Sequence, residues 1–143
     1  MNPTVLDAAE AKSRVLQMLE KSPFVSFATF GADDWPDVRV LLVAAKDDVD
    51  SLWFATATES PKIAQLRNNP KAAIYGYDMD EMTEFRLFGK VELLSDAVSR
   101  RKIWRDDFIQ HFPGGVDSET MIVMRFDTDH GVYDCYGREC GKF

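Results

Sequence analysis

The chain has 143 residues, of which 45% are apolar and 29% charged, and this composition predicts one globular domain over residues 1–143. Its formal charge of −7 argues against nucleic acid as a partner, because no basic surface is available to displace counterions from a polyanion. No apolar run approaches the roughly 20 residues of a membrane span and the N-terminus lacks a signal-peptide pattern, so we expect a cytoplasmic protein without a membrane partner.

The first half of the chain is predicted to be one helix followed by strands. Asp7, with Glu10 three residues on, caps a helix that runs to about Lys21 with its apolar residues at helical spacing. Aromatic and β-branched residues then predict strands at 24–30, 38–45 and 51–58. The last two are separated by an Asp47-Asp48 turn, so we expect them to form a hairpin.

The second half is predicted to hold two more helices and four more strands. Residues 60–69 form a short helix that Asn-Asn-Pro stops, and Gly89 suggests a bulge in an alternating strand. Ser95 begins a helix to about His111, with Trp104, Phe108 and Phe112 as one apolar stripe. The predicted strands are 71–77, 84–94, 119–126 and 131–136, the last two joined by a short turn.

These elements indicate a mainly β fold with flanking helices. About seven short strands follow one another through short connections, and such strands usually pair as antiparallel neighbours. A closed or nearly closed barrel leaves the fewest exposed strand edges. We therefore predict an antiparallel barrel with about three helices at its margins.

Arg39 is the one charged residue in the run VRVLLVAA (38–45), and strand alternation places its side chain on the same face as Leu41 and Val43. A buried guanidinium group without a partner costs several kcal/mol, so an anion is expected to meet it. That anion is an internal Asp or Glu or a bound ligand. A head group that reaches water at a frayed strand end is a further alternative.

The segment Ser60-Pro61-Lys62 begins the short helix. Ser is a favoured N-cap and Pro suits the first helical position, but Lys in the first turn opposes the helix dipole. A phosphate between its ammonium group and the free amides would make the lysine favourable; the alternative is a solvated lysine. Because the predicted hairpin puts Arg39 and Ser60 at the same end, we expect Arg39 and Lys62 to hold one phosphate, with Thr56 offering a hydroxyl.

The two cysteines, Cys135 and Cys140, are close in sequence, and in a cytosolic chain they are expected to be free thiols. Together with His130 they could suggest metal ligands, but their spacing matches no standard zinc pattern and no fourth ligand is evident. We therefore predict no metal site. No side chain is identified as a catalytic acid or base, and His111 and Cys135 are more consistent with structural roles.

Four segments carry a resemblance to a known family: VRVLLVAA, LWFATATESPKIAQLRNNPKAAI, FRLFGKVELL and HFPGG. They resemble the pyridoxamine 5′-phosphate oxidase-like, FMN-binding split-barrel proteins, in particular the general stress protein branch. The resemblance covers roughly residues 10–136, and the strand, Ser-x-Lys, helix and Asn-Pro succession is its most specific part. It implies an antiparallel split barrel, FMN as the cofactor, and a homodimer with FMN at the subunit interface.

The resemblance also implies the residues that contact FMN. The positions that match phosphate-binding residues are Arg39, Ser60 and Lys62. The positions that match a strand whose backbone lies along the flavin ring are Val40, Leu41 and Leu42, and those that match ribityl-phosphate contacts are Ala55 and Thr56. Glu84 stands where the oxidases have a Gln that reaches the flavin from the partner subunit, and a carboxylate cannot donate a hydrogen bond unless it is protonated.

Other positions depart from the true oxidases. Pro61 replaces an Arg on the FMN phosphate, Ala44 replaces a Lys that grips the substrate phosphate, and the ending YGRECGKF lacks their substrate-binding arm. We therefore predict an FMN-dependent oxidoreductase with an unknown small-molecule substrate and electron donor, which is not a pyridoxamine-phosphate oxidase. The alternatives are a non-catalytic flavin-binding general stress protein and a split-barrel relative that uses deazaflavin or haem.

Overall fold

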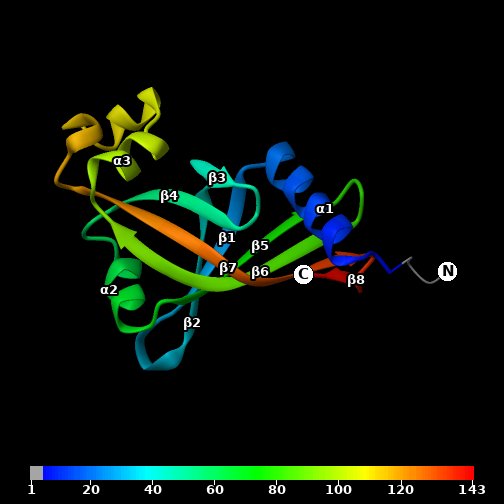
Figure 1. The fold of residues 1–143 in the computed structure, drawn as a ribbon. Coiled ribbons are helices and arrows are strands. Elements are labelled where there is room, and N and C mark those ends of the chain that lie inside the picture. Colours follow the sequence, from blue (N-terminus) through cyan, green and yellow to red (C-terminus); the bar gives the residue numbers. More distant parts are fainter. Residues whose placement is uncertain (1–4) are drawn as a thin grey trace.

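The computed structural model describes residues 5–143, in which eight strands form one antiparallel sheet with helices at its two ends (Figure 1). The strands are β1 (Phe24–Phe30), β2 (Pro36–Leu42), β3 (Ala45–Asp47), β4 (Ser51–Ala57), β5 (Lys71–Asp78), β6 (Thr83–Leu94), β7 (Met121–Cys135) and β8 (Arg138–Lys142). The α-helices are α1 (Ala8–Lys21), α2 (Pro61–Asn68) and α3 (Ala97–Ile103), and the 3-10 helices are η1 (Ala32–Asp34), η2 (Asp106–Gln110) and η3 (Gly115–Asp117). None of these helices has the length and apolar character of a membrane span.

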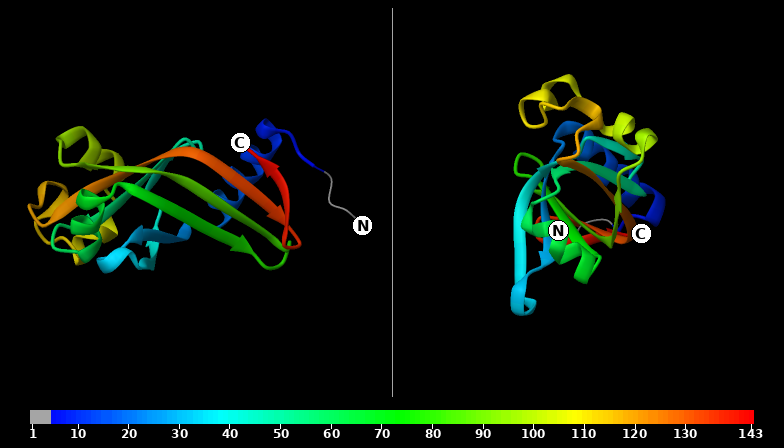
Figure 2. Two further views of the ribbon diagram at one scale, coloured as in Figure 1. Left: turned by 90° about the horizontal axis from the view of Figure 1, so that it is seen from below. Right: turned by 90° about the vertical axis from the view of Figure 1, so that its left-hand side faces the viewer.

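The sheet follows the order β2-β1-β5-β6-β7-β4-β3, with β8 paired to β7, and it curls into a half-barrel (Figure 2). Side chains that point inward fill the barrel core, where the Phe27 ring meets Phe54 and Phe126 edge to face at centroid distances of 5.2 and 6.2 Å. The prediction of a mainly β, antiparallel split barrel is confirmed. The two edge strands of the sheet, β2 and β3, are consecutive strands in the chain.

Helix α1 packs against the sheet as its sequence predicts. Asp7 is its N-cap and accepts a hydrogen bond from the Glu10 amide at 2.8 Å. Its buried residues Ala11, Val15 and Leu19 recur at helical spacing and join the barrel core. The helix therefore covers the end of the half-barrel near β8 (Figure 1).

The predicted hairpin between 38–45 and 51–58 is only partly right. The predicted strand is divided into β2 and β3, and only β3 pairs with β4, whereas β2 pairs with β1 along its whole length. The division falls at a corner, where the Val43 amide donates to the Pro23 carbonyl and the Ala44 amide donates to the Trp53 carbonyl, both at 2.8 Å. The continuous apolar run hid this change of partner, because both parts need buried residues.

The predicted helix from Ser95 to His111 is also wrong in its extent. Asp96 rather than Ser95 caps α3, which ends at Ile103, and η2 follows separately. The aromatic residues of the predicted stripe still pack together, in a flank cluster against the outer side of β4 and β7. This flank cluster consists of Trp53, Ile103, Phe108, Phe112, Met121 and Val123, with Trp104 packed against it.

Arg100 holds the segment after β6 in place. Its side chain is buried, and its guanidinium group donates to the backbone carbonyls of Ser95, Val116, Ser118 and Met121 at 2.7–3.3 Å. A buried guanidinium group needs partners for its donors, and here carbonyl oxygens supply them without a carboxylate. Arg100 thus ties α3 and η3 to the start of β7.

The last two predicted strands, 119–126 and 131–136, are one bent strand, β7, followed by an unpredicted β8. The polar residues read as a turn stay in the strand because they find partners: Thr128 Oγ1 donates to the Val49 carbonyl at 2.6 Å, and Asp127 accepts from Ser51 at 2.9 Å. The bulge predicted at Gly89 is confirmed and lies opposite this bend. A Cβ at Gly89 would lie 2.1 Å from the Asp127 carbonyl oxygen.

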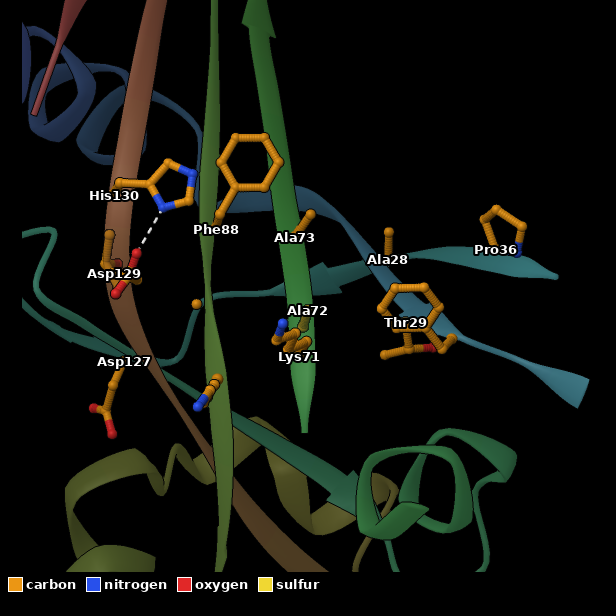
Figure 3. A pocket seen from close by; sticks show the side chains of 14 residues that line it. Ala28, Thr29, Pro36, Lys71, Ala72, Ala73, Phe88, Asp127, Asp129 and His130 are labelled. Atoms are coloured by element: carbon orange, nitrogen blue, oxygen red, sulfur yellow. Dashed lines mark hydrogen bonds and ion pairs between the residues drawn. The ribbon is translucent and has the colours of Figure 1, made fainter. Parts of the chain in front are cut away.

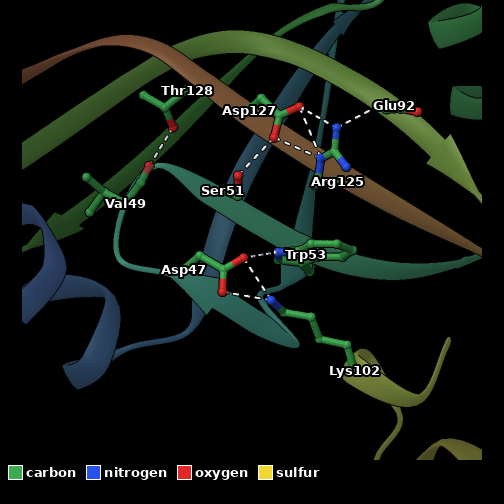
Figure 4. Close-up of polar contacts among 9 residues, drawn as sticks. All are labelled: Asp47, Val49, Ser51, Trp53, Glu92, Lys102, Arg125, Asp127 and Thr128. Atoms are coloured by element: carbon green, nitrogen blue, oxygen red, sulfur yellow. Dashed lines mark hydrogen bonds and ion pairs between the residues drawn. The ribbon is translucent and has the colours of Figure 1, made fainter. Parts of the chain in front are cut away.

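A second polar group joins α3 to the β3–β4 hairpin (Figure 4). Asp47 accepts from the Trp53 indole at 3.0 Å and from the Lys102 ammonium group at 2.7 Å. The Lys102 nitrogen lies 4.5 Å from the centre of the Trp53 ring, and the Arg125 guanidinium group 5.7 Å from it. Trp53 is therefore occupied by structural contacts on the outer side of the barrel.

Candidate functional site

The first turn of α2 presents a buried lysine. Ser60 is the N-cap residue and Pro61 follows it, but the Ser60 side chain caps no amide. Its hydroxyl instead accepts a hydrogen bond from Lys62 Nζ at 2.6 Å. Lys62 is only 8% exposed, so its ammonium group is largely removed from water, and it donates to a neutral hydroxyl group.

Arg39 lies on the inward face of β2, as strand alternation predicts. Its guanidinium group donates to Thr29 Oγ1 at 2.8 Å and to the Phe27 carbonyl at 3.2 Å, and it pairs with Asp37 at 2.9 Å. The internal carboxylate that the sequence left open therefore exists, although Asp37 is about half exposed and lies at the rim. The inner side of the guanidinium group faces α2.

Gln65 connects the two predicted phosphate ligands. It lies one turn after Lys62 in α2, and its Oε1 accepts from Thr29 at 2.6 Å and from Arg39 at 3.3 Å, while its amide nitrogen donates to Asp37 at 3.0 Å. Sequence analysis missed Gln65 and Thr29. The signal was available, since Gln65 shares a helix face with Lys62 and Thr29 shares the inward strand face with Arg39's partner Phe27.

Burial, and next the nearby charge of Arg39, lower the pKa of Lys62. Two cations thus lie close together in a partly buried place, and within residues 5–143 Lys62 forms no ion pair with a carboxylate. Such an arrangement favours a bound anion that both cations contact, with the free amides at the N-terminus of α2 beside it. The residues present therefore fit a phosphate group.

Strand β2, which carries Arg39, is an edge strand of the sheet. Val40, Leu41 and Leu42 pair with β1 on one side, and within residues 5–143 no strand pairs with their other side. Val40 points outward and Leu41 inward, so the backbone of β2 presents amide and carbonyl groups along its unpaired edge. This edge can bond the polar rim of a flat ring.

Ala55 and Thr56 lie on β4, which leads directly into Ser60. Thr56 is buried on the barrel side, and Ala55 faces the flank cluster. Both stay in the sheet, paired with Val123 and Ile122 of β7. The structure thus places them near the start of α2 by chain connection, whereas Arg39 reaches α2 across the gap.

Glu84 is not brought to Arg39 and Lys62 within one chain. It lies on the outward face of β6, which two strands, β1 and β5, separate from β2 in the sheet order. The Tyr75 phenol donates a short hydrogen bond to its carboxylate, and this bond raises the pKa of Tyr75 to about 12. Glu84 is therefore engaged by Tyr75 rather than by Arg39 or Lys62.

His130, Cys135 and Cys140 do not gather around a common centre. The His130 ring stacks on Phe88 at 4.8 Å and contacts Asp129 (Figure 3), while Cys135 and Cys140, on the β7–β8 hairpin, are not joined by a disulfide. Burial, and next the neighbouring Cys135, raise the pKa of Cys140 to about 11, which keeps it a thiol. Within residues 5–143, no three His, Cys, Asp or Glu side chains form a metal-binding group.

Comparison with known proteins finds one family along most of the chain. The family model for pyridoxamine 5′-phosphate oxidase matches residues 11–131. Pyridoxine/pyridoxamine 5′-phosphate oxidases from Paracidovorax citrulli and Burkholderia vietnamiensis are 37% identical over 75 residues and 33% identical over 90 residues. These matches cover 52% and 63% of this chain but only 33% and 42% of those enzymes.

Solved structures share the fold at lower identity. A Clostridium acetobutylicum protein related to general stress protein 26 superposes with a TM-score of 0.84 at 22% identity, over 94% of both chains. General stress protein 26 from Bacillus anthracis gives 0.74 at 16% identity, over 85% of this chain and 92% of that one. A Nostoc punctiforme protein described as pyridoxamine 5′-phosphate oxidase-related and FMN binding gives 0.65 at 20% identity, over 87% and 80%.

Proposed function

The chain belongs to the pyridoxamine 5′-phosphate oxidase family, and from this premise we propose that it is a homodimeric FMN-binding oxidoreductase whose substrate is not pyridoxamine phosphate. The observation that carries the proposal is the pair of cations at α2. Lys62 is buried with the neutral Ser60 hydroxyl as its hydrogen-bond partner, and Arg39 lies close enough to disfavour its charge. The FMN phosphate would remove this conflict.

We assign contact residues to each part of FMN. Arg39, Ser60 and Lys62 hold the phosphate, with Ala55 and Thr56 beside the ribityl chain. The open backbone edge at Val40, Leu41 and Leu42 bonds the polar rim of the flavin ring, and Glu84 of a second copy approaches from the other side. FMN supplies hydride and electron transfer when it is bound, whereas these residues bind it, orient it and limit its contact with water.

Two positions depart from those of the pyridoxamine-phosphate oxidases, one at the substrate phosphate and one at the cofactor phosphate. Ala44 lies at the corner between β2 and β3 and offers no charge to a substrate phosphate. Pro61 stands where the oxidases have an Arg on the FMN phosphate, so this chain has one cation fewer at the proposed cofactor phosphate site. A doubly charged substrate would lose its charge-assisted hydrogen bonds, so the substrate is a different small molecule.

A titration with FMN tests the proposal. We expect the wild type to quench FMN fluorescence, and Lys62→Ala to bind about 10- to 100-fold more weakly, because a charge-assisted hydrogen bond contributes about 1.5–3 kcal/mol. Lys46→Ala, at an exposed lysine on β3, is the matched control and should bind like the wild type. Equal affinity of Lys62→Ala and wild type, or a protein that binds deazaflavin or haem but not FMN, would overturn the proposal.

Turnover is tested separately from binding. The bound flavin is reduced with a nicotinamide donor, and its reoxidation by candidate acceptors is followed by the return of its visible absorbance. Reduction and reoxidation at steady state would support an oxidoreductase. A flavin that binds tightly but accepts electrons from no donor would instead support a non-catalytic flavin-binding protein.

A further inference from the structure

The β7–β8 hairpin places two thiol groups on the same side of the sheet. Cys135 ends β7 and Cys140 lies in β8, and the chain reverses between them at Tyr136 and Gly137, which have φ angles of 52° and 74°. A two-residue turn with two positive φ angles suits a tight β-hairpin. Cys140 joins the barrel core and Cys135 packs against this core, so both side chains point inward.

A bulge in this hairpin brings the two side chains together. The register shifts after Tyr133, which is opposite Gly141, and the shift leaves Cys140 as the extra residue of β8. A side-chain hydrogen bond joins Cys135 to Cys140, and another joins Cys135 to Tyr133. Two cysteines can be bridged only where their side chains already approach each other. The contact therefore fits a disulfide without a rearrangement of the strands.

The two thiols differ in their access to solvent. Cys140 is 4% exposed, whereas Cys135 is half-buried at the end of β7. A reagent from solution therefore reaches Cys135 first, and Cys140 then lies beside any group bound there. Burial raises the pKa of Cys140 to about 11, so the reduced pair is not held as a stabilised thiolate, which is the feature that makes some disulfides easy to reduce.

The pair lies where α1 rests on the sheet. Leu6, just before α1, donates its amide to the Cys140 carbonyl at 2.7 Å. Thr83, opposite Cys135 in the β6–β7 pairing, donates from its hydroxyl to the sulfur of Met18 in α1 at 3.8 Å. A bond between the two cysteines would therefore fix the C-terminal hairpin beneath this helix.

We propose that Cys135 and Cys140 form a redox-active pair, which a low-molecular-weight disulfide converts into an intrachain disulfide. In the first step the Cys135 thiol gives up its proton and its sulfur attacks one sulfur of the reagent, so that a mixed disulfide forms and one reagent thiolate leaves. In the second step Cys140 gives up its proton and attacks the Cys135 sulfur, and the other reagent thiolate leaves. The two thiolates take up the two protons, so two protein thiols are oxidised while one small disulfide is reduced to two thiols.

Oxidised glutathione, added to the flavin-free protein under native conditions, tests the pair. Intact mass spectrometry and maleimide labelling of the denatured product are the readouts. The wild type should lose the mass of two hydrogen atoms and both maleimide-reactive thiols, and it should retain no glutathione. Its melting temperature should rise by about 5 °C, because the bond closes a ring of residues 135–140 and so restricts the unfolded chain.

Two variants separate the steps. Cys140→Ala keeps the accessible thiol but removes the second nucleophile, so one glutathione should stay bound to Cys135 and the melting temperature should not rise. Cys135→Ser leaves only the buried thiol, which should react at least about 100-fold more slowly than the thiol of Cys140→Ala. Each variant is the matched control for the other, because each retains one of the two thiols.

Several outcomes would contradict the inference. In the wild type these are the retention of both thiols, the binding of two glutathione molecules, or a disulfide between two chains. A Cys140→Ala protein that holds no glutathione, although its circular dichroism matches that of the wild type, would contradict it too. The wild-type reaction needs no substitution, so it decides the inference even where a variant does not fold. No proposed FMN contact takes part, and the Lys62 titration decides FMN binding independently.

Discussion

Lys62 carries its charge where the fold disfavours it. Because burial and Arg39 lower its pKa in the folded chain, the folded state holds this proton less tightly than the unfolded state. Between the lowered pKa and the ordinary value of 10.5, the unfolded chain binds more protons, so stability rises with pH in that window. Below the window the charge costs stability in full, and only a bound anion offsets it.

We therefore predict that Lys62→Met weakens FMN binding but stabilises the flavin-free protein. The variant keeps the buried side-chain volume but loses the charge, so without flavin it should be about 1 kcal/mol more stable than the wild type at neutral pH. Thermal unfolding without flavin measures this gain, with Lys46→Met as the control. A variant that unfolds more easily would show that a partner already satisfies Lys62 in the free protein.

Glu84 and Tyr75 provide a test of the outward face. The hydrogen bond to Glu84 keeps the pKa of Tyr75 at about 12, above its ordinary 10.0. Its contribution to stability is complete below pH 10.0 and is lost as the pH rises through about 12. Glu84→Gln should lower this pKa toward 10.0, as followed by phenolate absorbance with Tyr75→Phe as the reference. An unchanged titration would mean that the carboxylate does not hold the phenol in solution.

The bulge in β6 is the clearest test at the level of elements. A side chain at Gly89 would collide with the Asp127 carbonyl, so Gly89→Ala should cost about 3 kcal/mol of unfolding free energy in urea. Gly115→Ala is the matched control, because its Cβ would meet nothing and only the positive φ of 78° disfavours it, at about 1 kcal/mol. Equal costs for the two variants would show that β7 moves freely away from β6.

The elements also show what sequence can predict. Periodicity identified α1 and the alternating strand β6, because each has one buried face and one exposed face. It failed at β2 and β3, where a continuous apolar run conceals a corner, and at β7, where Asp127 and Thr128 look like a turn but have partners across the sheet. Propensity depends on neighbours along the chain, whereas these boundaries depend on tertiary contacts.

The charged residues of the proposed phosphate site could be predicted from the sequence, but the hydrogen bonds that connect them could not. Arg39 and Lys62 stand out from their surroundings in sequence, and the structure brings them together. Gln65 and Thr29 are ordinary residues whose role appears only once α2 packs against β1. The position of Glu84 on the opposite face could not be read from the chain, because it requires the order of the strands in the sheet.

At the scale of the whole molecule, we expect the barrel core and the flank cluster to differ in local stability. The barrel core lies inside the sheet, whereas the flank cluster joins short helical turns to its outer side through Arg100. Amides of residues 97–118 should therefore exchange with solvent through an opening about 2 kcal/mol easier than that of β4 and β7.

Native-state hydrogen exchange measures this difference. The lysine of Arg100→Lys cannot reach all four carbonyls, so amide exchange in residues 97–118 should become faster. Amides of β4 should still exchange only through global unfolding of the variant. Uniform protection across both regions would mean that the two clusters unfold as one unit.

The pairing of β4 with β7 has a consequence for the order in which the molecule forms during synthesis. Residues 51–53 pair locally with β3, but β4 as a whole completes its pairing only with residues 121–127, whereas the hairpins of β1 with β2 and of β5 with β6 are local. As the chain leaves the ribosome, these hairpins form early, but the rings of Phe27 and Phe54 are enclosed only after Phe126 has been synthesised. The nascent chain thus exposes the rings of Phe27 and Phe54 until β7 emerges, and this is the interval in which a chaperone would protect it most.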